Sequence, residues 1–356
     1  MKKKIVSIVL ALAMAIGVFA MVTPAADETY KLSFAIHQPE TTAFTQGIKE
    51  WAAAVEEQSG GRLVIDIAWG GSLASAQDAV DVVRQGGADI CWNTVSLNPG
   101  YFTYCNILSM YGEELKNAQL TTYVYSNLCK NEPAFADEFK NMGVVLLGCH
   151  GMTPSLLAGN DAKIEALTDF QGKSIQSISK TCIAVLEALG AAVQGATPAD
   201  LYENLAKNVV SGTLVDSSLF VSNKLYEQFS WMNTYNYNSA LAFIIMNESK
   251  YNSLPEDLQQ ILMDNFDTLS FACAKYTDED LTYFIENTVP EYGIEVYDAS
   301  EEVTAAINEQ LDLQIKQPWA EKCAAAGYDT AAIEQEIETL IEEGRAQYGE
   351  QYDWFK

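Results

Sequence analysis

Residues 32–95 read LSFAIHQPETTAFTQGIKEWAAAVEEQSGGRLVIDIAWGGSLASAQDAVDVVRQGGADICWNTV, and this stretch decides the fold. Its hydrophobic pattern switches between a period of two residues and a helical period, with Gly-Gly or Gln-Pro at most of the breaks. The pattern predicts strand, helix, strand, helix and strand, over residues 32–37, 42–58, 63–69, 75–85 and 88–95. Elements in this order form a parallel sheet with helices on both of its faces.

The alternation of strands and helices continues along the rest of the chain. Further strands are predicted over residues 144–152, 173–177, 212–215, 240–247 and 294–297. Helices are predicted over residues 180–189 and 199–208, from Pro255 onward, and over 300–344. Two α/β units that interleave in this way predict two lobes joined by several chain crossings rather than by one linker.

The N-terminal segment has the pattern of a secretory signal. Lys2, Lys3 and Lys4 precede an uncharged apolar run over residues 5–22, and small residues follow up to Ala26. We interpret residues 1–25 as a signal peptide that is cleaved on export, which predicts a periplasmic or extracellular protein. An uncleaved membrane anchor is the alternative interpretation, and no later stretch has the pattern of a membrane span.

The composition narrows the classes of partner. The chain has 48 acidic and 21 basic residues, a formal charge of −27, which becomes −30 without the three N-terminal lysines. This charge disfavours binding to nucleic acid. Several of the seven cysteines lie in apolar runs and none forms a CxxC pair, so we interpret them as small buried side chains. We expect no metal site, no cofactor and a monomer.

Candidate site residues follow the predicted strands, because ligands of open parallel sheets bind at the carboxyl ends of the strands. The two histidines of the chain, His37 and His150, each fall at such an end, one in each predicted lobe. Aromatic residues lie beside amide or hydroxyl residues at other strand ends; Trp92 and Tyr237 are aromatic residues of this kind, and Thr94 is a hydroxyl residue. These residues fit either a pocket that stacks a ring and hydrogen-bonds its edge, or an ordinary core.

Arginine is scarce in this chain. Arg62 follows a Gly-Gly turn, Arg84 falls on a predicted surface helix and Arg345 in the last helix, so none is at a strand end. A ligand carboxylate clamped by Arg is therefore not expected. The G-x-S-x-G, H-E-x-x-H, Walker and dinucleotide-binding motifs are all missing from the sequence, and we expect no enzyme activity.

Several segments, in order, carry a resemblance to a known family. They are SGGRL at 59–63, GGADI at 86–90, LTDFQGKSI at 167–175, LYE at 201–203 with VVSG at 209–212, NKLYE at 223–227 and YNSLPEDLQ at 251–259. Over about residues 30–300 the chain resembles the solute receptors of tripartite ATP-independent periplasmic (TRAP) transporters, of the dicarboxylate-receptor (DctP) type.

The resemblance implies a two-lobed, periplasmic-binding-protein-like α/β fold. We expect lobe 1 at residues 27–147 and 240–255, lobe 2 at 148–239 and 290–356, and a long helix spanning both lobes at 256–289. Strands 144–152 and 240–247 are the expected hinges. The resemblance also implies closure on a small molecule in the cleft, and delivery of that molecule to integral-membrane permease subunits driven by an ion gradient.

Three positions depart from the family pattern. Gln176 stands where the family usually has an Arg that pairs with the ligand carboxylate, and Thr153 stands at a second position that is often basic. Val215, followed by Asp216, replaces a usual Asn. We therefore expect a ligand that is aromatic or largely apolar, and neutral or cationic. The expected ligand-binding residues are His37, Trp92, Thr94, His150, Thr153, Gln176, Val215, Asp216 and Tyr237.

Three alternatives to this interpretation remain. The ligand is an organic monocarboxylate held by backbone N–H groups, His150 or Lys180; or the same lobes present the ligand to a signalling receptor, as in a sensor. The third is a hydrolase that uses His37 or His150, for which the sequence offers no activated nucleophile.

The signal-peptide interpretation predicts the start of the mature protein. N-terminal sequencing of exported material should begin near Ala26 or Asp27, because the small residues there follow the apolar run. Exported protein that still begins with Met1 would show that the segment is not cleaved.

Overall fold

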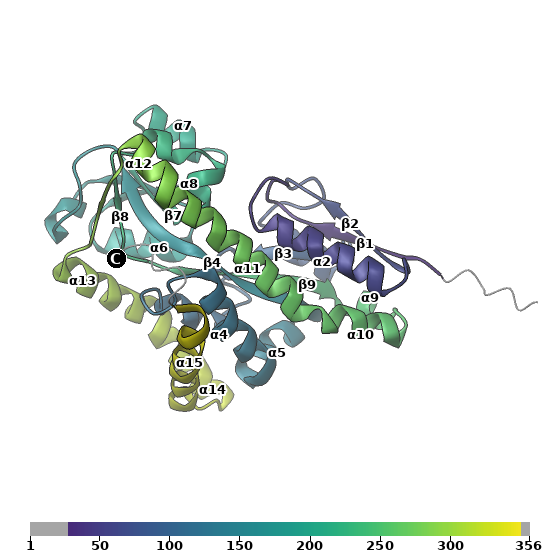
Figure 1. Cartoon of the computed structure of the whole chain (residues 1–356). Helices are drawn as coiled ribbons and strands as arrows, with labels where there is room; N and C mark the ends of the chain where they lie inside the picture. The colour runs from purple at the N-terminus through teal and green to yellow at the C-terminus, as the bar shows by residue number, and fades with distance from the viewer. Residues whose placement is uncertain (1–27, 350–356) are drawn as a thin grey trace, which may run out of the picture.

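The computed structural model describes residues 28–349 (Figure 1), so the predicted signal peptide lies outside the described residues. Within this part of the chain the strands form one sheet system in the order β2-β1-β3-β9-β4-β7-β5-β6, and β8 joins β10 to β4. Helices cover both sides of the sheet in Figure 1. The predicted α/β class with two lobes is confirmed; the exact lobe boundaries stay a prediction.

The N-terminal strands form the parallel group that the sequence predicts. Strand β1 (Tyr30–Ala35) pairs in parallel with β2 (Leu63–Ala68) and with β3 (Ile90–Thr94). Helices α2 (Thr45–Gln58) and α3 (Ala79–Arg84) connect these strands. The buried face of α2, with Ile48, Trp51 and Val55, packs on Leu32 and Phe34 of β1 in one apolar core.

A second parallel group lies at the other end of the sheet. Strand β5 (Ser174–Ser177) pairs in parallel with β6 (Ala192–Gly195) and β7 (Gly212–Asp216), with α6 (Lys180–Ala188) and α7 (Leu201–Ala206) between them in the chain. Two strands are not predicted from the sequence: β6, whose four residues are mostly exposed, and the three-residue strand β8 (Trp231–Asn233). Short strands of this kind carry little periodic signal.

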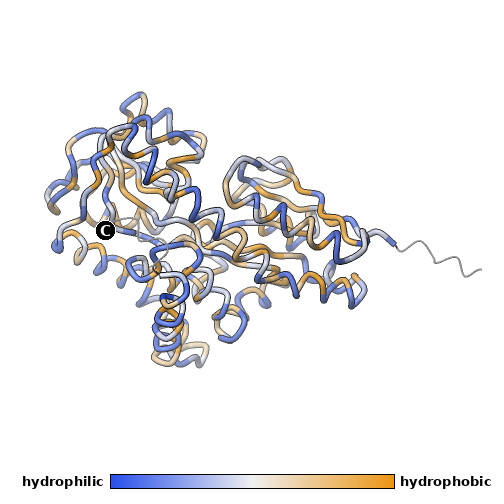
Figure 2. The backbone as a smooth tube through the Cα atoms, in the orientation of Figure 1, coloured by the Kyte–Doolittle hydropathy of each residue, from blue (hydrophilic) through white to orange (hydrophobic). Residues whose placement is uncertain are grey.

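Two long antiparallel strands connect the two groups. Strand β4 (Val144–Gly159) pairs with β9 (Ser239–Asn247) from Val144 to Pro154, and its last five residues pair with β7. Nearly all of both strands is buried. Figure 2 shows hydrophobic segments concentrated along these central strands, which continue from one half of the molecule into the other.

Helix α11 (Phe266–Tyr283) runs across the molecule and contacts elements of both halves, among them α2, β4 and α8 (Ser218–Ser222) (Figure 1). The sequence predicts one long helix, but the chain forms α10 (Glu256–Asp264) and then α11, with a break at Asn265. The amide of Asn265 exchanges hydrogen bonds with Gln58 at 2.8 and 3.2 Å, which fixes the break against α2. A π-helical turn over residues 284–288 leads from α11 into α12 (Val289–Tyr292).

The remaining helices are α4 (Ala118–Asn131), α5 (Pro133–Asn141), α9 (Glu248–Asn252), α13 (Glu301–Leu311), α14 (Gln317–Ala326) and α15 (Thr330–Gly344), with β10 (Glu295–Tyr297) before α13. Among them, α4 and α5 pack on β4, α9 packs at the ends of β9 and β4, α13 packs on α6, and α15 packs on α4. All seven cysteines are buried, as the sequence predicts, and none of them forms a disulfide within the described residues.

The approach of α2 to α11 yields a stability prediction. A Cβ at Gly47 would lie 2.5 Å from the backbone nitrogen of Cys273, and backbone atoms cannot rotate away. Gly47→Ala should therefore lower the free energy of unfolding by about 2 kcal/mol, even after the better helix propensity of Ala. Gly100→Ala, whose Cβ meets nothing within 4 Å, is the matched control and should leave denaturant unfolding unchanged. Equal midpoints for both variants would contradict this packing.

Candidate ligand-binding site

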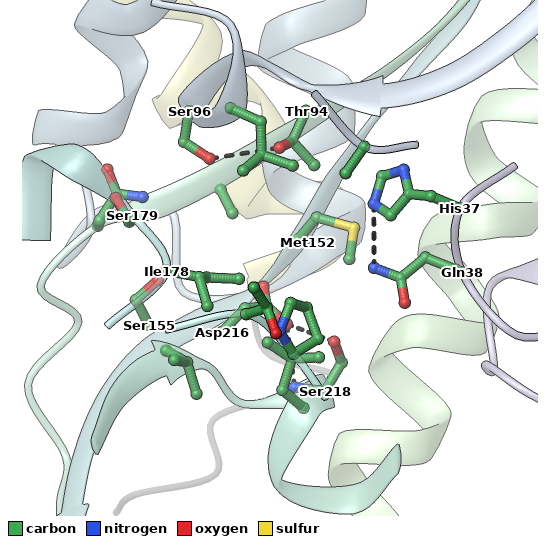
Figure 3. Close-up of a pocket in the computed structure, with 18 of the residues that line it drawn as sticks. His37, Gln38, Thr94, Ser96, Met152, Ser155, Ile178, Ser179, Asp216 and Ser218 are labelled. Carbon is green, nitrogen blue, oxygen red and sulfur yellow. Dashed lines mark hydrogen bonds between the residues drawn. The ribbon is translucent and has the colours of Figure 1, made fainter. Parts of the chain in front are cut away.

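A cavity lies where the two parallel groups of strands face each other (Figure 3). One wall comes from the ends of β1 and β3, with His37, Gln38, Trp92, Thr94 and Ser96. The opposite wall comes from the ends of β5 and β7 and the start of α8, with Ile178, Ser179, Val215, Asp216 and Ser218. The connecting strands β4 and β9 and the loop before β9 add Met152, Ser155, Asn238 and Ala240. The cavity therefore occupies the carboxyl ends of strands from both groups.

Trp92 supplies a large aromatic surface to the cavity, and its orientation is fixed by its neighbours. Phe44 stacks on the indole with ring centroids 4.5 Å apart and planes at 16°. The indole Nε1–H donates to Nε2 of His150 at 2.9 Å. The other nitrogen of that ring, Nδ1, therefore carries the proton and donates to the carbonyl of Gly151 at 2.9 Å.

The two histidines have different positions relative to the cavity. His37 lines it, and its Nε2 lies 3.4 Å from the side-chain nitrogen of Gln38. His150 is fully buried behind Trp92 and is not a lining residue. Burial lowers the pKa of both imidazoles to about 4, opposed at His150 by the backbone hydrogen bond. Both rings are therefore neutral at physiological pH.

Asp216 is the acidic residue of the cavity wall. Its Oδ1 accepts hydrogen bonds from Thr153 Oγ1 at 2.6 Å, the Ser218 backbone N–H at 3.0 Å and Ser218 Oγ at 2.5 Å. Its Oδ2 has no hydrogen-bond partner among residues 28–349. Burial raises the pKa of Asp216 to about 6, although the hydrogen bonds from Ser218 and Thr153 lower it.

Positive charge is missing from the cavity wall: no Arg or Lys of the described chain lines it. Arg62 forms an ion pair with Asp257, and Arg84 bonds to Asp81 and Tyr101. Arg345 lies at the end of α15, away from the cavity. Lys180, at the start of α6, is exposed and does not line the cavity either. A carboxylate in this cavity would find no cationic side chain to pair with.

The family follows from the match over most of the chain. Residues 34–322 match the bacterial extracellular solute-binding proteins, family 7 (DctP). The chain belongs to this family. Its family and fold are those of transport receptors rather than enzymes, and the resemblance to TRAP receptors is confirmed. The family implies a periplasmic location, and no helix between residues 28 and 349 is long and apolar enough to cross a membrane.

Three solved structures illustrate the shared fold of this receptor. A TRAP periplasmic solute-binding protein from Desulfovibrio salexigens, an open complex with the C-terminus of a symmetry mate in its ligand-binding site, is 25% identical with a TM-score of 0.77, over 92% of this chain and 99% of its own. One from Bordetella bronchiseptica, with bound (R)- and (S)-mandelate, is 20% identical with a TM-score of 0.77, over 88% and 99%. One from a marine metagenome, specific for aromatic acids and bound to 3-hydroxybenzoate, is 19% identical with a TM-score of 0.75, over 92% and 99%.

The receptor brings five of the nine expected site residues to the cavity wall: His37, Trp92, Thr94, Val215 and Asp216. Two more lie directly behind it, where Thr153 bonds to Asp216 and His150 bonds to Trp92. Tyr237 is buried edge-on against Tyr235, with ring centroids 5.4 Å apart, and does not line the cavity.

Five further residues line the cavity that were not predicted from the sequence: Ser96, Met152, Ser155, Ser179 and Ser218. Three of them, Ser96, Ser179 and Ser218, lie two residues beyond the end of a strand, which is the signal that could have identified them.

Gln176, at the position of the usual family Arg, points to α7 rather than to the cavity. Its Nε2 donates to the carbonyl of Leu201 and its Oε1 accepts from Asn204 Nδ2, both at 2.9 Å. The side chain is fully buried, and both of its polar ends are satisfied by these contacts. Gln176 therefore has a structural role in this conformation.

This arrangement predicts what an arginine would do at that position. Gln176→Arg should lower the free energy of unfolding by about 3 kcal/mol, because it buries a guanidinium that no acidic side chain compensates. Gln194 is the exposed residue of β6 that pairs in register with Gln176, and it provides the matched control. Gln194→Arg should change the free energy of unfolding by less than about 0.5 kcal/mol. Denaturant unfolding measures both. A Gln176→Arg protein of normal stability that gains succinate binding would contradict this assignment.

Proposed function

We propose that this protein is the exported receptor of a TRAP transporter that captures a small ligand, aromatic or largely apolar and neutral or cationic, in the cavity between its lobes. It then delivers the ligand to the permease subunits in the membrane. The proposal treats the receptor as a monomer that works without a metal or cofactor. It builds on the family, and adds the ligand class from the chemistry of the cavity wall.

The observation that carries the ligand class is the charge of the cavity wall. The titratable side chains that line it are a neutral His37 and Asp216, whose pKa of about 6 leaves it mostly ionised at neutral pH. A ligand anion would lose its hydration without gaining a cation, which is costly, and would also face Asp216. Apolar side chains make up much of the remaining wall, among them Trp92, Leu97, Met152, Ile178, Val215 and Leu219.

Delivery depends on a conformational change that the shared strands allow. Ligand atoms that touch Trp92 on one wall and Val215 on the other stabilise the conformation in which both walls are close together. The connecting strands β4 and β9 are the proposed hinges, and β4 contains register shifts between Leu146 and Gly148 and between Gly151 and Pro154. A permease that recognises the closed form would receive loaded receptors preferentially.

A second candidate is a receptor for an aromatic monocarboxylate. It is favoured by the mandelate and 3-hydroxybenzoate in the two solved neighbours, although their identity to this chain supports only the fold. In this cavity the anion would depend on backbone N–H groups and on hydroxyls such as those of Ser96 and Ser179, because His150 is sequestered behind Trp92. The same ligand screen distinguishes the two candidates.

The proposed function is tested by a thermal-shift screen of small metabolites followed by small-angle X-ray scattering. A ligand of the cavity should raise the melting temperature by mass action, and should reduce the radius of gyration at saturation as the walls close. Val215→Phe fills the cavity from a buried position and should abolish both effects, whereas Val296→Phe on the exposed surface should preserve them. A bound ligand that leaves the radius of gyration unchanged would contradict closure.

A further inference from the structure

The two oxygens of the Asp216 carboxylate differ in their hydrogen bonding: Oδ1 accepts three hydrogen bonds and Oδ2 accepts none from the described residues. Three donors from Thr153 and Ser218 converge on Oδ1 and hold the carboxylate in one orientation. Oδ2 is buried and has no partner in the described chain. Buried acceptors are nearly always hydrogen-bonded in folded proteins, so an unpaired one on the wall of a ligand cavity indicates that the missing donor belongs to the ligand.

The negative charge of the Asp216 carboxylate favours a cationic hydrogen-bond donor on the ligand. No Lys or Arg lines the cavity, so the negative charge of Asp216 is not compensated by the protein. A cationic group of the ligand would supply both the hydrogen bond and the opposite charge, and charge-assisted hydrogen bonds are about twice as strong as neutral ones. A hydroxyl group would supply only the hydrogen bond.

The rest of the cavity suits the remainder of such a ligand. Figure 3 shows Asp216 and Ser218 on one side, Thr94 and Ser96 on the opposite side, and Met152 between them. Trp92 adds an aromatic surface to the Thr94 side. A molecule with a cationic nitrogen at one end, an apolar middle and a polar far end would match this order of side chains.

We infer that Asp216 is the anchor for a positively charged nitrogen of the ligand, an ammonium or an amidinium group. The inference rests on the proposed function and narrows its ligand class from neutral or cationic to cationic. Thr153 acts as a positioning residue, because its hydroxyl donates to Oδ1 and leaves Oδ2 as the unpartnered oxygen.

Among the side chains that line the cavity, Asp216 is the one whose charge changes between pH 5 and pH 7.5. His37 is the other titratable group of the cavity wall, and β4 adds His150; both titrate near pH 4. Strand β7 and helix α8 add no further charged side chain. Helix α11, which packs on α8, carries five charged side chains, none of which contributes to the pKa shift of Asp216: Asp267, Lys275, Asp278, Glu279 and Asp280. Burial raises the pKa of Asp278 to about 7, so this group titrates in the same range in both the wild type and Asp216→Asn, and the comparison of the two isolates Asp216.

The decisive experiment compares three probes of nearly the same shape and different charge: benzamidine, benzamide and benzoate. Isothermal titration with the mature protein near pH 7.5 should show the tightest binding for benzamidine and the weakest for benzoate. Asp216→Asn keeps an oxygen for Thr153 and Ser218 but removes the charge, so it should weaken benzamidine by roughly tenfold to a hundredfold and leave benzamide within about threefold. Asp66→Asn removes an equal charge from the exposed face of β2 and should leave all three affinities unchanged.

The pH dependence gives an independent readout. Benzamidine should bind about tenfold more weakly near pH 5 than near pH 7.5, because protonation of Asp216 removes the charge it pairs with. In Asp216→Asn this dependence should vanish. If the anchor carried no charge in the wild type, benzamidine would show the same affinity at both pH values.

Unliganded stability checks that the variant folds and reports on the same charge. The folded-state pKa of about 6 lies above the ordinary value of 3.8, so the stability that Asp216 contributes falls as the pH rises from about 4 to 6 and stays lower above that range. Asp216→Asn should therefore melt at or above the wild-type temperature near pH 7.5.

Three outcomes of the titrations would contradict the proposal that Asp216 anchors a cationic nitrogen: undetectable binding of benzamidine, equal affinities for the three probes, or tighter binding of benzoate. A benzoate-selective protein that still closes on its ligand would leave the receptor function intact.

Discussion

Strand β4 is common to both halves of the sheet, and the rest of the architecture depends on it. Its first part pairs with β9 and its last five residues pair with β7. The strands of both halves are therefore joined by backbone hydrogen bonds to this one strand. Two glycines of this strand allow close packing: a Cβ at Gly148 would lie 2.9 Å from Leu269 of α11, and one at Gly151 would lie 2.4 Å from Thr121 of α4. The two register shifts of β4 fall beside these glycines, where the ladder is already irregular. Bending at these points therefore disturbs fewer backbone hydrogen bonds than bending elsewhere in the strand.

The same strand connects the cavity to the helices behind it. Trp92 donates to His150 in the middle of β4, and the next residue, Gly151, donates its N–H to Thr122 of α4 at 2.9 Å. The N-terminus of α4 is in turn held by the buried Asp278 of α11, which accepts from the backbone N–H groups of Ala118 and Gln119 at 2.7 and 3.0 Å. The aromatic wall of the cavity thus rests on the elements that cross between the lobes. A ligand that contacts Trp92 would therefore affect the conformation of β4, the proposed hinge, through the Trp92–His150 hydrogen bond.

The sequence predicted the fold well because its strands have clear periodic patterns and Gly or Pro at their ends. It also found the cavity residues that directly follow or end a strand, such as His37, Thr94 and Asp216. The roles of residues inside strands were predicted less well. Gln176 lies within β5, where side chains point to the two faces of the sheet, and its amide faces α7. The resemblance to the family indicates the backbone position of this residue but not the direction of its side chain.

Contacts formed by tertiary packing were beyond sequence reasoning. His150 ends a predicted strand, yet β4 continues to Gly159 and leaves the histidine in its middle, behind Trp92. Tyr237 falls in the loop before β9, where the neighbouring Asn238 lines the cavity and the tyrosine packs on Tyr235. The donors that hold Asp216 come from two elements, at positions 153 and 218, and no local pattern relates them.

Ligand recognition in this receptor is proposed to occur between the two walls, through Asp216 and Trp92 and without an arginine. The most direct measurement is a crystal structure of the mature protein bound to the ligand with which it co-purifies from its natural host. We expect a ligand in contact with both walls, with its apolar part on Trp92 and a nitrogen about 3 Å from Oδ2 of Asp216. A ligand whose carboxylate occupies that position, or one that binds outside this cavity, would contradict this proposal.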